Sequence, residues 1–104
     1  MECKLLVRFY EKKLTKRIDL EIHYKNRVVK VWTWYPYFSF LFKIDNQESK
    51  EGNVKGESPG ENLEKILEFI AKEIGIDNDC LKKLKQKLTY LLAKMLEALL
   101  TNNS

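Results

Sequence analysis

A chain of 104 residues suits one small domain and leaves little room for a deep catalytic cleft. Apolar residues make up 44% of the chain and charged residues 33%, which is typical of a globular protein and excludes a disordered one. No run approaches the ~20 apolar residues of a membrane-spanning helix, and the charged start MECKLLVRFYEKK is unlike a signal peptide. We expect a cytoplasmic protein.

The net charge of +4 lies mostly in the first part of the chain. Residues 1–44 hold ten Lys and Arg against four Asp and Glu, whereas residues 45–104 hold nine against eleven. A polyanionic partner is therefore expected to meet residues 1–44, although the overall charge alone is explained more simply by a well-solvated surface.

The two cysteines, Cys3 and Cys80, are far apart in the sequence. Together with the single His23 they cannot complete a tetrahedral zinc site, so no metal is expected. We expect both cysteines to be buried free thiols in a reducing compartment.

Residues 4–12 and 17–24 alternate between apolar and polar side chains, which is the period of half-buried strands. The next stretch, Arg27 to Ile44, holds both Trp and predicts two further strands. Lys25-Asn26 suits a two-residue turn, because Asn tolerates a positive φ. The register set by this turn places Arg17 opposite Trp34, within reach of a cation–π contact.

Tyr35-Pro36 predicts the next reversal, because Pro cannot donate to a strand ladder; the sequence does not decide whether this bond is cis. With a two-residue turn here, Val31 faces Phe40, and both turns assign the same residues to the core. The expected inner face is Ile18, Leu20, Ile22, Val29, Val31, Phe38, Phe40 and Phe42.

Residues 45–58 are polar and predict a mobile connector. A helix is expected to begin with Ser58 as its cap, Pro59 at its first position and Glu61 completing a capping box, and to end at Gly75. A second helix is expected from residues 77–79 to about residue 100. Apolar stripes mark both helices, at Leu63, Ile66, Leu67, Ile70 and Ile74 and at Leu81, Leu84, Leu88, Leu92, Met95 and Leu99, the second widened by Leu91, Leu96 and Leu100.

These elements predict an α+β fold in one domain of residues 1–104. A four-stranded antiparallel meander occupies residues 1–44, a flexible loop 45–58, and a helical pair 59–104 covers one face of the sheet. The wide stripe of the second helix favours a homo-oligomer, a dimer or tetramer.

The other face of the sheet is expected to stay open and to mix aromatic rings with cations. Bases stack on such rings at ~1–3 kcal/mol each while Lys and Arg track phosphates, so the pattern favours single-stranded nucleic acid, bound with little sequence preference. The candidate binding residues are Lys4, Arg8, Tyr10, Arg17, Lys30, Trp32, Trp34, Tyr37 and Lys43.

The segments KVWTWYPYFSF and LTYLLAKMLEALL, within this layout, resemble the ThermoDBP-related single-stranded-DNA-binding proteins of thermophilic archaea. The resemblance implies binding of single-stranded DNA on the sheet face by Trp32, Trp34, Tyr37, Lys30 and Arg17. It also implies oligomerisation through the C-terminal helix.

Other interpretations stay open. The Trp-bearing face could instead be a protein interface, with a partner or a second copy, and RNA could bind the same face because no residue marks a 2′-hydroxyl reader. No enzyme or cofactor is expected: His23 has no Ser or Cys partner, and no glycine-rich phosphate loop is present. The stripe Lys83, Lys87 and Lys94 could contact phosphate, but a solvated helix face is the simpler interpretation.

Overall fold

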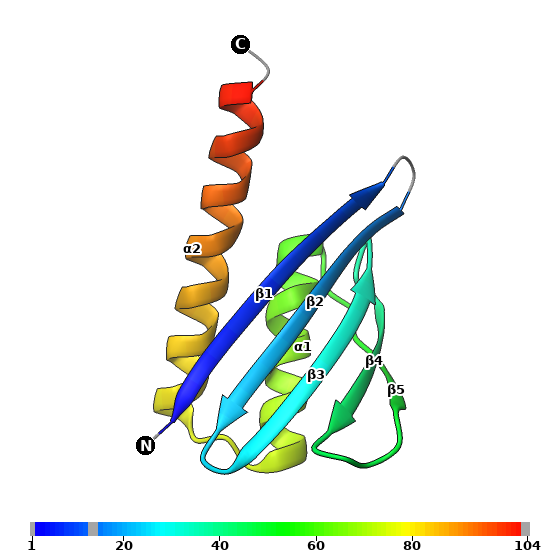
Figure 1. Cartoon of the computed structure of the whole chain (residues 1–104), viewed down its shortest axis with the longest axis vertical. Coiled ribbons are helices and arrows are strands. Elements are labelled where there is room, and N and C mark those ends of the chain that lie inside the picture. The colour runs from blue at the N-terminus through cyan, green and yellow to red at the C-terminus, as the bar shows by residue number, and fades with distance from the viewer. Residues whose placement is uncertain (1, 13–14, 103–104) are drawn as a thin grey trace.

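The chain folds into one five-stranded antiparallel sheet and two helices (Figure 1). This computed structural model describes residues 2–12 and 15–102. In chain order the elements are β1 Cys3–Lys12, β2 Thr15–Tyr24, β3 Arg27–Trp34, β4 Ser39–Ile44, β5 Lys50–Asn53, α1 Pro59–Ile74 and α2 Asn78–Asn102. The expected α+β meander with two C-terminal helices is confirmed, with one strand more than predicted.

The β2–β3 hairpin has the register that the sequence predicts. Arg17 lies opposite Trp34 and Ile22 opposite Val29. The positive φ of the turn is taken by Lys25, at 54°, although the prediction relied on the tolerance of Asn. The inward and outward residues of β2 and β3 are therefore those expected.

The β3–β4 turn is longer than the predicted two residues. Tyr35-Pro36 is cis, Tyr37 has a φ of 74°, and β4 begins only at Ser39. Val31 consequently pairs with Phe42, and the predicted pairing with Phe40 was wrong by two residues. An even shift leaves each strand residue on its predicted face, since side chains alternate with a period of two.

Within the turn itself the alternation does not hold, because these residues are not extended. Phe38, predicted to face the core, is 45% exposed. Tyr37, predicted to lie on the open face, is buried. Both predictions were wrong for the same reason: they continued the strand period into a turn.

The predicted connector contains the fifth strand, β5, which pairs with β4. Gly52 lies opposite Phe40, and a side chain at this position would collide with the Phe40 ring. The absence of a side chain lets a polar segment approach the sheet edge closely. The β-propensities of the residues in KEGN disfavour a strand at this position.

The helix boundaries follow their capping signals. The Ser58 hydroxyl accepts from the Glu61 N–H at 3.1 Å, and Gly75 ends α1 with a φ of 74°. The Glu61 carboxylate accepts from the N–H of Glu57, one residue earlier than a capping box requires. Asp77 opens α2 by accepting from the Cys80 N–H at 2.8 Å.

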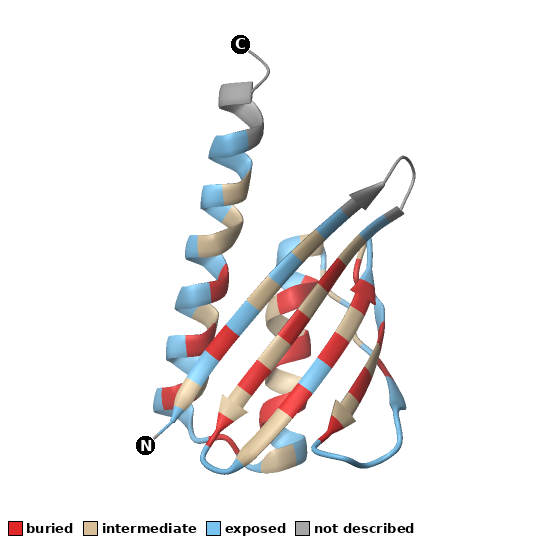
Figure 2. Ribbon diagram, in the orientation of Figure 1, coloured by how far each residue is buried: buried red, intermediate tan, exposed pale blue. Residues whose placement is uncertain are grey.

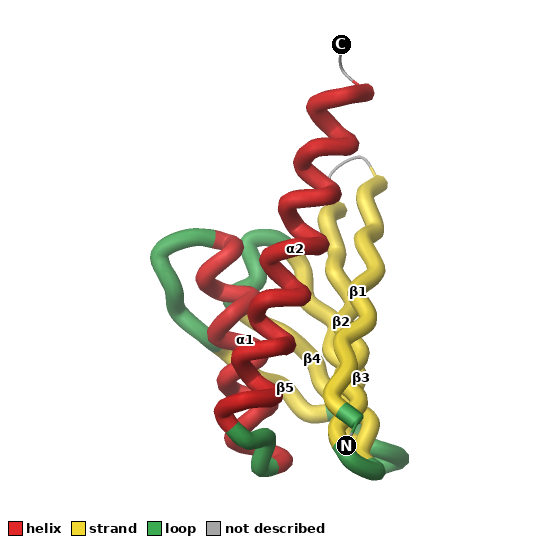
Figure 3. Tube along the Cα trace, turned by 90° about the vertical axis from the view of Figure 1, so that its left-hand side faces the viewer, coloured by secondary structure: helices red, strands yellow, loops and turns green. Residues whose placement is uncertain are grey.

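Both helices cover the same face of the sheet, as Figure 3 shows. The inner side chains of the strands meet the apolar stripes of α1 and α2 there, and the bands of buried residues in Figure 2 alternate along β2, β3 and β4. The buried core includes Ile18, Leu20, Ile22, Val29, Val31, Phe40, Phe42, Leu63, Ile66, Leu67, Ile70, Leu84 and Leu88.

One polar side chain in this core, Asn62 of α1, is 1% exposed and makes two hydrogen bonds. Its amide nitrogen donates to the Pro36 carbonyl at 2.9 Å, and its oxygen accepts from the Gly56 N–H at 2.6 Å. Asn62 thus holds the β3–β4 turn and the segment before α1 against the same helix.

Cys3 and Cys80 form a disulfide, so the prediction of two free thiols was wrong. β1 and α2 run in the same direction (Figure 1), which brings the first residue of β1 beside the first turn of α2, with a Cα–Cα distance of 5.9 Å that a disulfide can span. The bond closes a sequence separation of 77 residues. The reducing compartment inferred from free thiols loses its basis.

The last turns of α2 extend beyond the sheet (Figure 1). Leu84 and Leu88 are buried, Leu92 and Met95 are half-buried, and Leu96 is 57% exposed. The apolar stripe therefore becomes exposed where the helix passes the end of the sheet. The side chains of Leu99 and Leu100, which the sequence assigns to this stripe, lie outside the described residues.

Candidate nucleic-acid interface

The face of the sheet opposite the helices is uncovered, as the side view in Figure 3 shows. Trp34 is 41% exposed, Tyr10 is 40% exposed and Trp32 is half-buried. Neither indole is sealed in the core. We call this surface, formed by the outward residues of β1 to β4, the open face.

The strand register arranges the open face into cross-strand rows. Directly opposed residues share a face, so each row brings together side chains that are distant in sequence. The rows are Lys4–His23–Val28, Leu6–Glu21–Lys30–Lys43, Arg8–Asp19–Trp32–Leu41 and Tyr10–Arg17–Trp34. Eight of the nine candidate binding residues lie in these rows, and each aromatic row contains a cation.

Arg17 is held in place by two partners. Its guanidinium lies over the Tyr10 ring at 4.2 Å from the centroid, whereas the sequence predicted a contact with Trp34. It also pairs with Asp19, with Nε–Oδ1 at 2.9 Å and Nη2–Oδ2 at 3.1 Å. Arg17 therefore orders the Tyr10 ring, and Asp19 offsets much of its charge.

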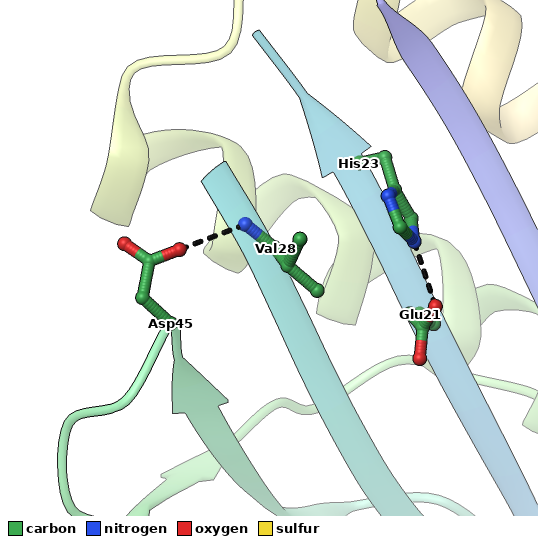
Figure 4. A network of polar contacts seen from close by, with 4 residues as sticks. All are labelled: Glu21, His23, Val28 and Asp45. Atoms are coloured by element: carbon green, nitrogen blue, oxygen red, sulfur yellow. Dashed lines mark hydrogen bonds and ion pairs between the residues drawn. The ribbon is translucent and has the colours of Figure 1, made fainter. Parts of the chain in front are cut away.

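A second carboxylate on the open face, Glu21, is paired along its own strand. The His23 Nε2 lies 2.6 Å from the Glu21 Oε2 (Figure 4). This hydrogen bond, with smaller contributions from the charges of His23, Lys30 and Arg8, lowers the pKa of Glu21 below its ordinary value. Glu21 is thus anionic at neutral pH, within a mainly cationic surface.

The charge of the open face is positive but mixed. Three cations, Lys4, Arg8 and Lys30, are exposed, while Arg17 and Lys43 are half-buried. Against these five cations stand Asp19 and Glu21, so the formal charge of the open-face residues whose side chains are described is +3, and Glu51 of the neighbouring β5, opposite Leu41, lowers it to +2. Such a surface attracts phosphate without being strongly basic.

A shallow hollow of about 310 Å³ marks the centre of the open face. Leu6, Arg8, Lys30 and Trp32 line it together with the two carboxylates of the neighbouring β2 positions. It brings an aromatic ring, an aliphatic side chain and two cations around one depression, as a base with its phosphate requires.

The ninth candidate, Tyr37, does not belong to this surface. Its ring packs edge-to-face against Tyr35 at 5.6 Å and 82°, and it lines a second hollow with Leu63 and Met95, which Tyr10 and Arg17 of the open face also line. Tyr35 is 56% exposed, with the Lys16 Nζ 5.4 Å from its ring centroid. Tyr35 is not among the predicted site residues, because its only signal in the sequence is its position in a turn between strands.

A different set of contacts stabilises the opposite end of the β3–β4 hairpin. The Asp45 carboxylate accepts from the Val28 N–H at 2.9 Å (Figure 4) and from Arg27 Nε at 2.7 Å. The Val28 hydrogen bond, then that of Arg27, lowers the pKa of Asp45. These contacts close the hairpin and contribute no side chain to the rows that carry the indoles.

No protein-family model, no curated protein and no solved structure matches this chain. Within residues 2–12 and 15–102, no helix is long and apolar enough to cross a membrane. Over the same ranges, no three His, Cys, Asp or Glu residues lie together as a metal site would require.

Proposed function

We propose that the protein is a non-enzymatic single-stranded-DNA-binding protein that uses the open face with little sequence preference. The observation that carries the proposal is the exposure of Trp34 and Trp32 on a face that the helices leave uncovered. A large apolar ring on such a surface favours a partner that can cover it. A nucleic-acid base provides a flat partner of the right kind.

The spacing of alternate residues along β3 suits base stacking. Alternate residues of an antiparallel strand, such as Trp32 and Trp34, are about 6.8 Å apart. This is twice the ~3.4 Å rise per nucleotide along one DNA strand, so one base can occupy the space between two rings. Tyr10, in the row of Trp34, extends the stacking surface to β1.

The cations suit the phosphates of the same strand. Lys4, Arg8 and Lys30 are exposed beside the rings, and none of the three lies in a short ion pair among the described contacts. Because Asp19 and Glu21 share the surface, we expect stacking to contribute more of the affinity than charge, and a moderate salt dependence.

Self-association is the second part of the proposal. We propose that the C-terminal half of α2 joins copies of the chain, because its apolar stripe continues past the sheet with Leu96 exposed.

A protein interface on the open face is the competing function, since exposed Trp also favours protein contacts. If the protein works in the cytoplasm, its disulfide resembles those of hyperthermophile proteins, which keep disulfides inside the cell.

The test compares labelled dT oligomers in fluorescence anisotropy with the wild type and with Trp32→Ala/Trp34→Ala. Loss of two stacking rings, at ~1–3 kcal/mol each, should weaken binding at least about thirtyfold. Tyr90→Ala is the matched control, because Tyr90 is an exposed aromatic residue of α2, 48% exposed and outside the open face. Its affinity should equal that of the wild type.

Three results would count against the proposal. Unchanged binding by the double Trp variant would remove the open face from the interaction. Equal affinity for duplex DNA would contradict stacking on unpaired bases. If the double variant dissociates in sedimentation experiments while the wild type remains associated, the face is a protein interface. The same titration with rU oligomers decides whether RNA binds as well.

A further inference from the structure

A groove of about 460 Å³ runs between β1 and α2, at the edge of the sheet. Lys4 and Leu6 line it from β1, and Lys83, Lys87 and Leu91 line it from α2. Its remaining lining is apolar, from Cys3, Leu5, Val7 and Leu84. β1 is an edge strand, so the groove is open to the surroundings along this side.

All the charged residues that line the groove are cations. Lys4, Lys83 and Lys87 are all exposed, and no carboxylate is among its lining residues. The groove on the other side of α2 differs, because Glu64 lines it and Lys85 there pairs with Glu68 at 2.8 Å. Three ammonium groups around an apolar floor complement a polyanion with apolar parts.

The groove and the open face are continuous. Leu6 lines both the groove and the central hollow of the open face, where Arg8, Lys30 and Trp32 also lie. Leu6 is 41% exposed and is the apolar residue that lies between the two cationic surfaces. A flexible strand can therefore pass from Trp32 across Leu6 to Lys4 without meeting another element.

We propose that a bound single strand leaves the open face over Leu6 and continues along the groove, with its phosphates against Lys4, Lys83 and Lys87. This extension rests on the proposed function and enlarges the binding site from the sheet to α2. It gives Lys83 and Lys87 a role as phosphate contacts rather than as part of a solvated helix face. The disulfide between Cys3 and Cys80 holds the two walls of the groove together.

The experiment measures the affinity of two dT oligomers, of about six and about twenty nucleotides, for Lys83→Glu/Lys87→Glu. The short oligomer occupies only the open face, while the long one reaches the groove. The matched control is Lys72→Glu/Lys82→Glu, which makes the same change in net charge at two exposed lysines outside the groove. Trp32→Ala/Trp34→Ala reports on the open face in parallel.

The groove variant should bind the long oligomer on the order of tenfold more weakly than the control at 0.1 M salt. Its salt slope for this oligomer should fall by about 1.4, since each phosphate contact on a single strand contributes ~0.7. Its affinity for the short oligomer should match that of the control.

Equal affinities of groove variant and control for the long oligomer would overturn the extension. If the double Trp variant loses the short oligomer in that case, the proposed function stands alone. Failure of both oligomers to bind the wild type would remove both proposals. If the groove variant instead changes only the oligomeric state in sedimentation, the groove is an interface between copies and holds no nucleic acid.

Discussion

The two faces of the sheet are built from the same strands, yet they differ sharply in burial. On the inner face Ile22, Val29 and Val31 are fully buried, whereas Leu6, Tyr10 and Trp34 on the open face remain 40–41% exposed. Both faces carry large apolar side chains. The difference teaches that a large apolar side chain of this sheet becomes fully buried only on the face that the helices cover.

We expect the largest loss of stability from removing the covalent link between the helix layer and the sheet. Cys3→Ala/Cys80→Ala removes a link that closes a sequence separation of 77 residues on the inner side. In the chain-entropy model this should lower the free energy of unfolding by about 4.5 kcal/mol, measured by urea denaturation. The wild type in reducing agent should behave in the same way. Unchanged stability in both experiments would mean that the bond does not form in solution.

A direct comparison of the two faces uses one aliphatic residue from each. Ile22→Ala, at a position with 0% exposure, should destabilise the protein by about 2–5 kcal/mol because it leaves a cavity in the core. Leu6→Ala, on the paired strand but on the open face, should change stability by less than about 1 kcal/mol. Similar losses from the two substitutions would show that something covers the open face in solution.

The smallest expected effect on stability comes from the hydrogen bonds of single carboxylates on the two faces of the sheet. Asp77 joins the layers, because it caps α2 and accepts from the hydroxyl of the buried Tyr24 at 3.0 Å. Its hydrogen bond from the Cys80 N–H, followed by that from Tyr24, lowers the pKa of Asp77 below its ordinary 3.8. The stability it contributes is complete above pH 3.8 and is lost as the pH falls through the lowered folded value.

Asp77→Asn should therefore reduce the acid sensitivity of unfolding, measured by urea titrations between pH 6 and about pH 3. Asn still caps the helix, so only the charged form is lost. Glu21→Gln is the counterpart on the open face, where the partner His23 belongs to the same strand. In a Glu21→Gln background, Asp77→Asn should reduce the acid sensitivity of unfolding by the same amount as in the wild type. An acid transition identical in wild type and Asp77→Asn would contradict the linkage.

The regular parts of the fold could be predicted from the sequence because they depend on local patterns. The period of two in β2 and β3, together with the Lys25-Asn26 turn, sufficed for the register that places Trp32 and Trp34 outward. Ser58 and Gly75 marked the ends of α1 by local hydrogen bonding and backbone conformation. The candidate site followed from the same alternation, which explains why eight of nine residues lie on one face.

The failures involve turns and long-range contacts. Tyr37 and Phe38 exchanged environments because the β3–β4 turn spans more residues than predicted. β5 forms because Gly52 can approach the Phe40 ring, and that closeness is set by β4. The role of Asn62 depends on a turn 26 residues earlier. No local pattern carries this information.

The sequence by itself determined which residues of each strand share a face and where α1 begins and ends, because these properties depend on neighbours within a few positions. Only the tertiary structure decided that Cys3 meets Cys80, that α2 continues beyond the sheet, and that Leu6 joins the open face to a lysine-lined groove. These features depend on how separate elements pack, and packing geometry is set by the whole core at once.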